Sequence, residues 1–376
     1  MSADAERLAW AYLSRVAEPP CPTLNAWVHA VGPVEAAARV RAGAEPAAIT
    51  GHVEARRETD CAEADLETLD RRGGRLITPG CDEWPHVPFA SFATAEKKDA
   101  HPPLVLWATG TARLDEVGER SAAIVGTRAA TAYGEHVAAD LAAGLAESDV
   151  AVVSGAAYGI DGAAHRAALA AEGITVAVLA GGIDVPYPSG HSSLLHRITR
   201  DGLLLSEYPP GVRPARYRFL TRNRLVAAIS RATVVVEAGL RSGAANTASW
   251  AADLGRVVCA VPGPVTSSAS AGCHQLLRNN RDVELVTRSA EILEIVGRIG
   301  ECAEEQPRPA ARLDGLTGAE RVVYEALPGR GTRSVDEIAV EAGLPAAQVL
   351  GPLAMLELNG FVLRDEGRWR LAKIKR

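Results

Sequence analysis

The residues best suited to chemistry in this 376-residue sequence are arginines interleaved with aromatic side chains. No acidic residue occurs between Glu207 and Glu237, and that interval contains Arg213, Arg216, Arg218, Arg222, Arg224 and Arg231 together with Tyr208, Tyr217 and Phe219. Guanidinium groups bind phosphates, and aromatic rings stack on unpaired bases at about 1–3 kcal/mol per base. The stretch therefore predicts a surface for single-stranded nucleic acid, with a solvated arginine surface as the alternative.

Short turns of small residues offer further contacts. These turns are Gly126-Thr127-Arg128, Ser154-Gly155-Ala156 and Ser242-Gly243. Glycine lets a backbone turn tightly, and the start of a following helix presents free N–H groups to an anion. Arg128 stands where the dinucleotide fingerprint G-x-G-x-x-G requires glycine, so no nicotinamide or flavin cofactor is expected.

Asp161 and His165 lie one turn apart in a segment that is expected to be helical, so the two side chains could meet. An acid–histidine pair can act as a general acid and base, but a local structural contact is the commoner reason for one. The six cysteines are scattered without a C-x-x-C pair, which argues against a zinc site. We therefore expect no catalytic residue and no metal.

These residues need a scaffold, and the central part of the chain provides its pattern. Short apolar runs alternate there with amphipathic segments, which is typical of an α/β fold with a parallel sheet covered on both faces. The expected strands are Leu104–Ala108, Ala122–Val125, Val150–Ser154, Thr175–Leu179, Leu203–Ser206, Thr233–Val236, Val257–Val261 and Val283–Leu285. Ligands of such sheets bind at the carboxyl ends of the strands, where the short turns lie.

Four segments are expected along the chain. Residues 1–75 predict a helical domain of the SAM or helix-hairpin-helix kind, and residues 76–298 the α/β core. Residues 299–312 form a charged, proline-bearing linker. Residues 313–376 predict three helices and a hairpin, the order of a winged helix. Its third helix, Pro345–Leu358, contains no lysine or arginine, so we expect this domain to contact protein rather than to read duplex DNA.

Charge and hydropathy narrow the class of protein. The formal net charge is -6, so any nucleic-acid contact must come from a local patch. The acidic first residues do not resemble a signal peptide, and no apolar run is long enough to span a bilayer. A cytoplasmic protein with reduced cysteines is expected.

Taken in order, the motifs resemble the DNA-processing protein A (DprA/Smf) family over roughly residues 75–285. The matching pieces are Ile124–Arg128 with Tyr133-Gly134, Ser154–Ala156 with Gly159–Asp161 and His165, Ala177–Leu179 with Gly182, Asp184 and Tyr187-Pro188, Ser206–Pro209, Phe219 with Arg222–Arg224, Val236–Ala238 with Ser242-Gly243 and Thr247-Ala248, and Ala260–Gly263. Each motif alone is weak, but the ordered set is specific.

The resemblance implies an extended Rossmann-like core that binds single-stranded DNA without catalysis. It also implies protection of incoming DNA in natural transformation, help in loading the RecA recombinase during homologous recombination, and a homodimer formed through the core. By the same resemblance, the DNA-facing residues would be Gly126, Thr127, Arg128, Ser154, Gly155, Phe219, Arg222, Asn223, Arg224, Ser242, Gly243 and Thr247.

The chain departs from the family pattern in four places. Leu220 stands where a proline usually follows the phenylalanine, and His191 where an asparagine usually follows the Tyr-Pro pair. Ala244-Ala245-Asn246 replaces a small residue and a hydrophobic pair, and Asn279-Asn280 replaces a Gly-Ala. The last two departures lie where the edges of the binding pocket are expected.

Two other functions remain open at this point. One is a Rossmann-like hydrolase that cleaves a base from a ribose phosphate, but the loop at residues 237–243 lacks the glycine triplet typical of such enzymes. The other is a protein-interaction adaptor without DNA binding, which the acidic net charge permits.

Overall fold

The computed structural model describes residues 3–240, 242–297, 316–328, 331–365 and 367–372, so the expected linker at 299–312 lies outside the described residues. The chain forms two compact units, Met1–Ala303 and Glu304–Arg376. The first contains the helical N-terminal segment and the α/β core, and the second contains the C-terminal helices and hairpin.

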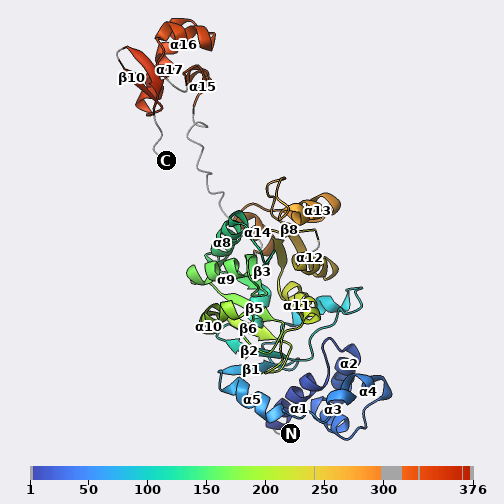
Figure 1. Ribbon diagram of the computed structural model, residues 1–376. Helices are drawn as coiled ribbons and strands as arrows, with labels where there is room; N and C mark the ends of the chain where they lie inside the picture. Colours follow the sequence, from blue (N-terminus) through green and yellow to red (C-terminus); the bar gives the residue numbers. More distant parts are fainter. Residues whose placement is uncertain (1–2, 241, 298–315, 329–330, 366, 373–376) are drawn as a thin grey trace. The chain divides into compact units, whose positions relative to one another are not determined.

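A mixed sheet lies at the centre of the first unit (Figure 1). Its strand order is β1-β2-β6-β5-β4-β3-β7-β8-β9. The strands from β6 to β9 run parallel, whereas β2 pairs antiparallel with β6 and with β1. The strands are β1 (Gly74–Ile77), β2 (Leu106–Gly110), β3 (Ser121–Val125), β4 (Ala151–Ser154), β5 (Thr175–Leu179), β6 (Leu203–Ser206), β7 (Ala232–Val235), β8 (Val257–Ala260) and β9 (Val283–Leu285).

All eight expected strands are present, with ends shifted by no more than two residues, and the α/β fold class is confirmed. The expectation of a wholly parallel sheet is wrong at one edge, where β1 and β2 run antiparallel. Strand β1 was not expected, because Gly74-Arg75-Leu76-Ile77 is too short and too mixed to show a strand pattern. Its place is set by pairing, with Leu76 opposite Trp107.

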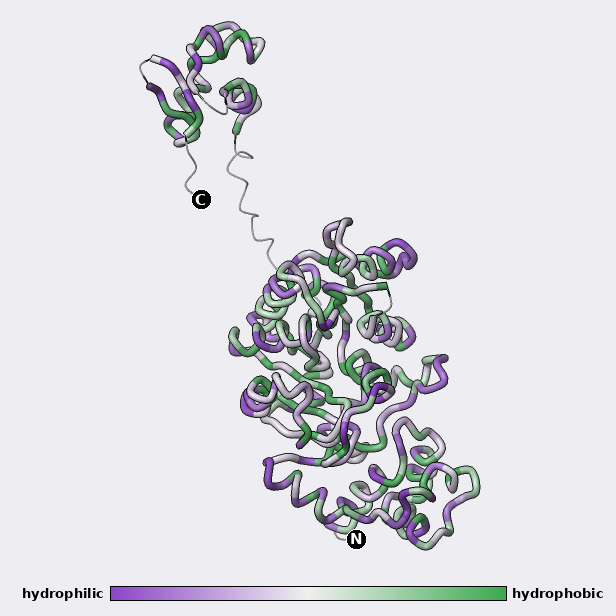
Figure 2. Tube along the Cα trace, viewed as in Figure 1, coloured by the Kyte–Doolittle hydropathy of each residue, from purple (hydrophilic) through white to green (hydrophobic). Residues whose placement is uncertain are grey.

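Helices cover both faces of the sheet, as Figures 1 and 2 show. On β3, Ala122 and Ile124 pack toward one set of helices, and Ala123 and Val125 toward the other. Both faces are therefore dry, which explains why the strand is apolar from Ala122 to Val125. One face carries α8 (Ala132–Ala146), α9 (Ile160–Ala170), α10 (Ser192–Asp201) and α14 (Ser289–Val296), and the other carries α11 (Arg216–Ile229), α12 (Gly243–Asp253) and α13 (Ala271–Asn279).

The N-terminal helices pack on the β1–β2 edge of this sheet. Trp107 of β2 is fully buried in one cluster with Leu13 and Leu24, so this part of the chain shares a core with the sheet. A turn at Gly32 separates two of these helices. The elements of this part and of the connection that follows it are α1 (Ala3–Val16), α2 (Pro22–Val31), α3 (Pro33–Arg41), α4 (Ala47–Val53), η1 (Glu54–Arg56), α5 (Ala62–Asp70), α6 (His86–Ala90), η2 (Ser91–Ala93) and α7 (Leu114–Glu119). A further short helix, η3 (Ser189–His191), precedes α10.

The second unit has the expected winged-helix order. It consists of α15 (Gly318–Glu325), α16 (Val335–Ala342), α17 (Ala346–Leu358), β10 (Val362–Asp365) and β11 (Arg368–Leu371). A capping box formed by Ser334 and Glu337 opens α16, and Trp369 packs in the small core with Leu353.

Among the described residues, no single helix has both the length and the hydropathy of a membrane span. Helices α16 and α17 meet that criterion only as a pair, and the pair is bent by 104°.

Candidate functional site

The site lies where the strand order changes direction. From β3 the chain continues to β4 on one side, and it later returns with β7 on the other side of β3. Loops that diverge at such a point leave a crevice at the carboxyl ends of the strands. A cavity of about 860 Å³ opens there, which we call the core cavity.

Most of the residues expected to face DNA line the core cavity. Those residues are Gly126, Thr127, Arg128, Gly155, Phe219, Arg222, Asn223, Ser242, Gly243 and Thr247. Two others do not line it. The Ser154 hydroxyl is buried and donates to the Ile124 carbonyl at 2.7 Å. The Arg224 side chain is fully buried and ion-paired with Glu207.

An aromatic step stands at the rim of the core cavity. The Phe219 and Tyr187 rings have centroids 5.3 Å apart with 51° between their planes. The Arg128 guanidinium lies over the Phe219 ring, 4.9 Å from its centroid. Tyr187 is 45% exposed, so this step presents a ring to solvent beside a cation. Such a pair can stack on a base and bind the adjoining phosphate.

The buried side chain of Arg222 forms the floor of the core cavity. Its Nη1 donates to the Gly155 carbonyl at 2.7 Å and to the Val178 carbonyl. Burial lowers the pKa of Arg222 to about 10, against the opposing charge of Asp161, so the group stays cationic at neutral pH. A Cβ added to Gly155 would clash with this guanidinium, so a larger residue there would displace the end of the Arg222 side chain.

The start of α12 forms the opposite wall. The Ser242 hydroxyl caps the helix by accepting from the Ala245 amide at 3.3 Å. Asn223 donates to the Gly243 carbonyl at 3.3 Å and to the Asn246 side chain at 3.1 Å. Asn246, one of the departures from the family pattern, thus helps to hold Asn223 at the cavity. The free N–H groups and dipole of this helix end favour an anion.

The turn after β3 is held from two sides. The Thr127 amide donates to the Glu237 carbonyl at 2.7 Å, and the Glu237 carboxylate accepts from the Thr131 amide at 2.9 Å and from its hydroxyl at 2.6 Å. Gly159 closes over the same turn with φ of +74°. A Cβ there would lie 2.3 Å from the Thr127 carbonyl oxygen.

Replacing Gly159 by alanine is therefore expected to strain the backbone and displace Thr127 and Arg128. We expect a loss of about 1–3 kcal/mol in the free energy of unfolding, measured by urea denaturation. Gly51→Ala in α4 is the matched control, because a Cβ there meets nothing within 4 Å and the change is expected to be neutral or stabilising. Equal effects of the two changes contradict this account of the turn.

Asp161 and His165 have separate partners. The Asp161 carboxylate accepts from the Gly155 amide at 3.1 Å and from the Ala157 amide at 3.3 Å. His165 Nδ1 lies 2.7 Å from the Thr175 hydroxyl, which itself donates to the Val152 carbonyl, so Nδ1 carries the proton. Each side chain therefore forms hydrogen bonds within the local structure.

His165 makes stability depend on pH. Burial lowers the pKa of His165 to about 3, with the nearby charges of His191, Arg222 and Arg166 adding to the effect. The unfolded chain, with a pKa near 6.5, then binds the proton first, so this stability is complete above about pH 6.5 and is lost as the pH falls toward 3. From about pH 7 to about pH 5 the expected loss from this group is about 2 kcal/mol. Urea denaturation at both pH values measures it, and the same loss in His165→Leu contradicts the assignment.

The arginine-rich stretch does not form one surface. Arg216 and Arg222 line the core cavity. Arg218 is paired with Glu18, and Arg231 donates to the Glu119 carbonyl. The stretch therefore contributes two cations to the cavity, Arg216 and Arg222, and the turn after β3 contributes a third, Arg128. The Asp161 carboxylate lines the same cavity and brings negative charge to it. Burial raises the pKa of Asp161, and the positive charge of Arg222 partly offsets this effect.

The cavity also contains residues that the motifs did not assign to it. Tyr187, Arg216 and Leu220 line it. Tyr187 belonged to a quoted motif and Arg216 to the arginine-rich stretch, so both carried a signal. Tyr187 comes from the loop after β5 and Arg216 from the start of α11, and no local pattern indicates that these two segments meet at one cavity.

The chain is similar to known proteins over most of its length. The family described as "DNA recombination-mediator protein A" matches residues 75–297, and the "DprA winged helix domain" matches residues 306–368. The DNA processing protein DprA assigned in Mycobacterium tuberculosis is 69% identical over 373 residues, covering 98% of this chain and 95% of that protein.

Two solved structures are similar as well. The crystal structure of DprA from Streptococcus pneumoniae has a TM-score of 0.63 and 30% identity, covering 78% of this chain and 98% of that one. A structure of DNA processing protein A from Helicobacter pylori, described by its single-stranded DNA binding mode, has a TM-score of 0.50 and 26% identity, covering 59% of this chain and 94% of that one. The family match spans more than half of the chain and the similarity to the mycobacterial protein nearly all of it, so the chain belongs to the DNA recombination-mediator protein A family, also called DprA/Smf.

Proposed function

We propose that the protein binds single-stranded DNA in the core cavity. The observation that carries this proposal is the convergence of Arg128, Phe219 and Tyr187 beside the start of α12. The cations and the helix end suit phosphates, and the rings suit unpaired bases. A duplex hides the faces of its bases, so a stacking site favours a single strand.

The contacts expected in the cavity carry little base information. Backbone N–H groups, guanidinium groups and stacked rings recognise features that every nucleotide shares. Binding is therefore expected to be independent of sequence.

Equilibrium binding of a fluorescent oligonucleotide, alone and annealed to its complement, tests the proposal. We expect tighter binding of the single strand and a linear fall of log K with log salt. With one phosphate contact each from Arg128, Arg216 and Arg222, the slope of log K against log salt is expected to be about -2, at about -0.7 for each contact. Equal affinity for both forms, or no dependence on salt, would favour the adaptor function instead.

We infer that binding proceeds without catalysis. Asp161 and His165 are each bound to other groups, which leaves neither placed as a general acid or base in the cavity. The competing hydrolase function has a direct test. Release of free base from nucleoside monophosphates by the purified protein contradicts this inference, and no release supports it.

For the cellular role, we propose a cytoplasmic homodimer that protects incoming single strands and helps to load RecA recombinase. The description of the family as a recombination mediator supports this role. The test is the rate at which RecA assembles on a single strand already covered by single-strand-binding protein. Acceleration by the wild-type chain and not by a chain with a disabled core cavity supports it, and equal rates contradict it.

For the winged helix we propose a protein contact rather than duplex reading. Helix α17 carries no basic residue, and Leu350 and Leu358 on it are 52% and 78% exposed. Deleting residues 313–376 is expected to leave the affinity for a single strand within about threefold of wild type, because the residues that line the core cavity all belong to the first unit. Loss of most of the affinity contradicts this role.

A further inference from the structure

A second cavity lies between the N-terminal helices and the α/β core. It has a volume of about 360 Å³, and we call it the interdomain cavity. Four arginines from separate parts of the chain line it: Arg15 of α1, Arg56 of η1, Arg213 of the loop before α11, and Arg218 of α11. Its size lies within the range of pockets that hold small ligands.

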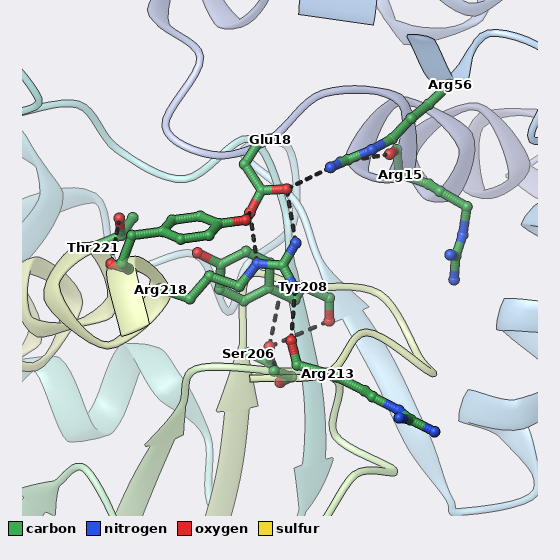
Figure 3. A network of polar contacts seen from close by, with 10 residues as sticks. Arg15, Glu18, Arg56, Ser206, Tyr208, Arg213, Arg218 and Thr221 are labelled. Atoms are coloured by element: carbon green, nitrogen blue, oxygen red, sulfur yellow. Dashed lines mark hydrogen bonds and ion pairs between the residues drawn. The ribbon is translucent and has the colours of Figure 1, made fainter. Parts of the chain in front are cut away.

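A carboxylate already shows how this cavity binds an anion (Figure 3). Arg218 donates to both oxygens of Glu18, at 2.6 and 2.9 Å. Arg56 donates to the same carboxylate at 2.8 Å, and the Tyr217 hydroxyl at 3.0 Å. These hydrogen bonds outweigh burial and lower the pKa of Glu18. The surrounding donors therefore favour negative charge at this point.

The lining keeps positive charge after its internal pairs are counted. Glu18 offsets one cation, and Asp65 holds Arg15 through two hydrogen bonds of 2.6 Å. Two of the four positive charges remain uncompensated. Arg213 is exposed, and its guanidinium has no ion-pair partner among the described residues. Clefts lined by one sign of charge concentrate ligands of the opposite sign.

A buried hydroxyl on the same wall also lacks a partner. Tyr208 lines the interdomain cavity and is 2% exposed, and its hydroxyl makes no hydrogen bond to the described residues. A buried polar group without a partner is uncommon in folded proteins, and a bound ligand is one of its explanations.

The two cavities are adjacent along one loop. Pro209, Val212 and Arg213 line the interdomain cavity, and residues 214–216 line the core cavity. Arg213 and Arg216 are both exposed and neither has a carboxylate partner among the described residues, so the loop carries two available cations from one cavity toward the other. A strand that leaves the aromatic step at Phe219 meets these cations next.

We propose that the interdomain cavity is a phosphate site that takes the backbone of the same single strand whose neighbouring nucleotides occupy the core cavity. This inference rests on the proposed function of the core cavity. It extends the contact surface to the N-terminal helices, with Arg213 and Arg56 as the phosphate ligands. Arg218 and Glu18 hold the wall in place.

The test uses the full chain and a length series of fluorescent oligothymidylates. The variant is Arg56→Gln with Arg213→Gln, and the matched control is Arg197→Gln, an exposed arginine of α10 that lines neither cavity. We expect the variant to bind the shortest ligands as wild type does. It should bind long ligands about tenfold more weakly, with a salt slope shallower by about 1.4. Arg213→Gln alone keeps the test valid if the loss of the Arg56–Glu18 pair lowers the melting temperature.

Each outcome decides one part of the proposal. Unchanged binding of every length by the variant overturns the phosphate site, and so does an equal loss at every length. Calorimetry with inorganic pyrophosphate separates a free ligand from the DNA backbone. Arg213-dependent binding of pyrophosphate with unchanged DNA binding overturns the DNA assignment. If wild type binds no oligonucleotide of any length, the proposed function of the core cavity fails, and the pyrophosphate result alone then decides whether the interdomain cavity binds phosphate.

Discussion

Replacing Arg224 by alanine is expected to destabilise the fold rather than to remove a DNA contact. The guanidinium makes two hydrogen bonds to the Glu207 carboxylate, at 2.8 and 2.6 Å, and a third to the His101 carbonyl at 3.1 Å. Arg224 is 0% exposed and Glu207 is 4% exposed. Removing the arginine leaves a buried carboxylate without its cation, which costs about 3–5 kcal/mol.

The measurement is the free energy of unfolding from urea denaturation. Arg216→Ala is the control, because Arg216 is exposed and the expected change is within about 0.5 kcal/mol. The double variant Glu207→Gln with Arg224→Met is expected to recover part of the loss, since it removes both buried charges. A fully stable Arg224→Ala that has lost its affinity for a single strand contradicts this structural role.

Replacing Phe219 by alanine is expected to weaken binding of a single strand by about 1–3 kcal/mol, or about 5- to 150-fold in Kd. The ring is central to the aromatic step, because it packs against the Tyr187 ring and the Arg128 guanidinium lies over it. Stacking does not depend on released counterions, so the salt slope should remain close to that of wild type.

A variant that lacks two arginines of the core cavity is expected to change the salt slope. Arg128→Gln with Arg216→Gln should make the salt slope shallower by about 1.4, since two phosphate contacts are lost. Tyr158→Ala serves as the aromatic control, because Tyr158 is 47% exposed and does not line the core cavity. A change of slope in Phe219→Ala equal to that of the arginine variant contradicts the division between stacking and charge.

The sequence alone predicts the framework of the fold well, because buried parallel strands carry their own pattern. Strand β3 is apolar at every position that faces helices on either side, so its existence follows from local composition. Strand β1 has no such pattern, and only its pairing with β2 defines it. The antiparallel edge is a property of that pairing and not of either segment.

The sequence likewise predicts which segments reach the candidate site better than it predicts where their side chains point. The turns after β3 and β4 lie at the strand ends that the alternation predicts, so Arg128 and Gly155 reach the cavity as expected. The stretch at residues 207–237 signals positive charge but not its direction. Arg222 and Arg224 are two residues apart on α11, and the helix turns them toward different partners, the cavity floor and Glu207. That outcome depends on a carboxylate 17 residues earlier in the chain, whose partner the sequence does not indicate.

Photochemical cross-linking can locate the bound strand on the protein. An oligonucleotide containing 5-iododeoxyuridine is bound to the wild-type chain, irradiated and digested, and the modified residue is found by mass spectrometry. The account predicts cross-links at Phe219 or Tyr187, the rings at the rim of the core cavity. Cross-links confined to the winged helix at residues 316–372 would place the strand elsewhere and contradict it.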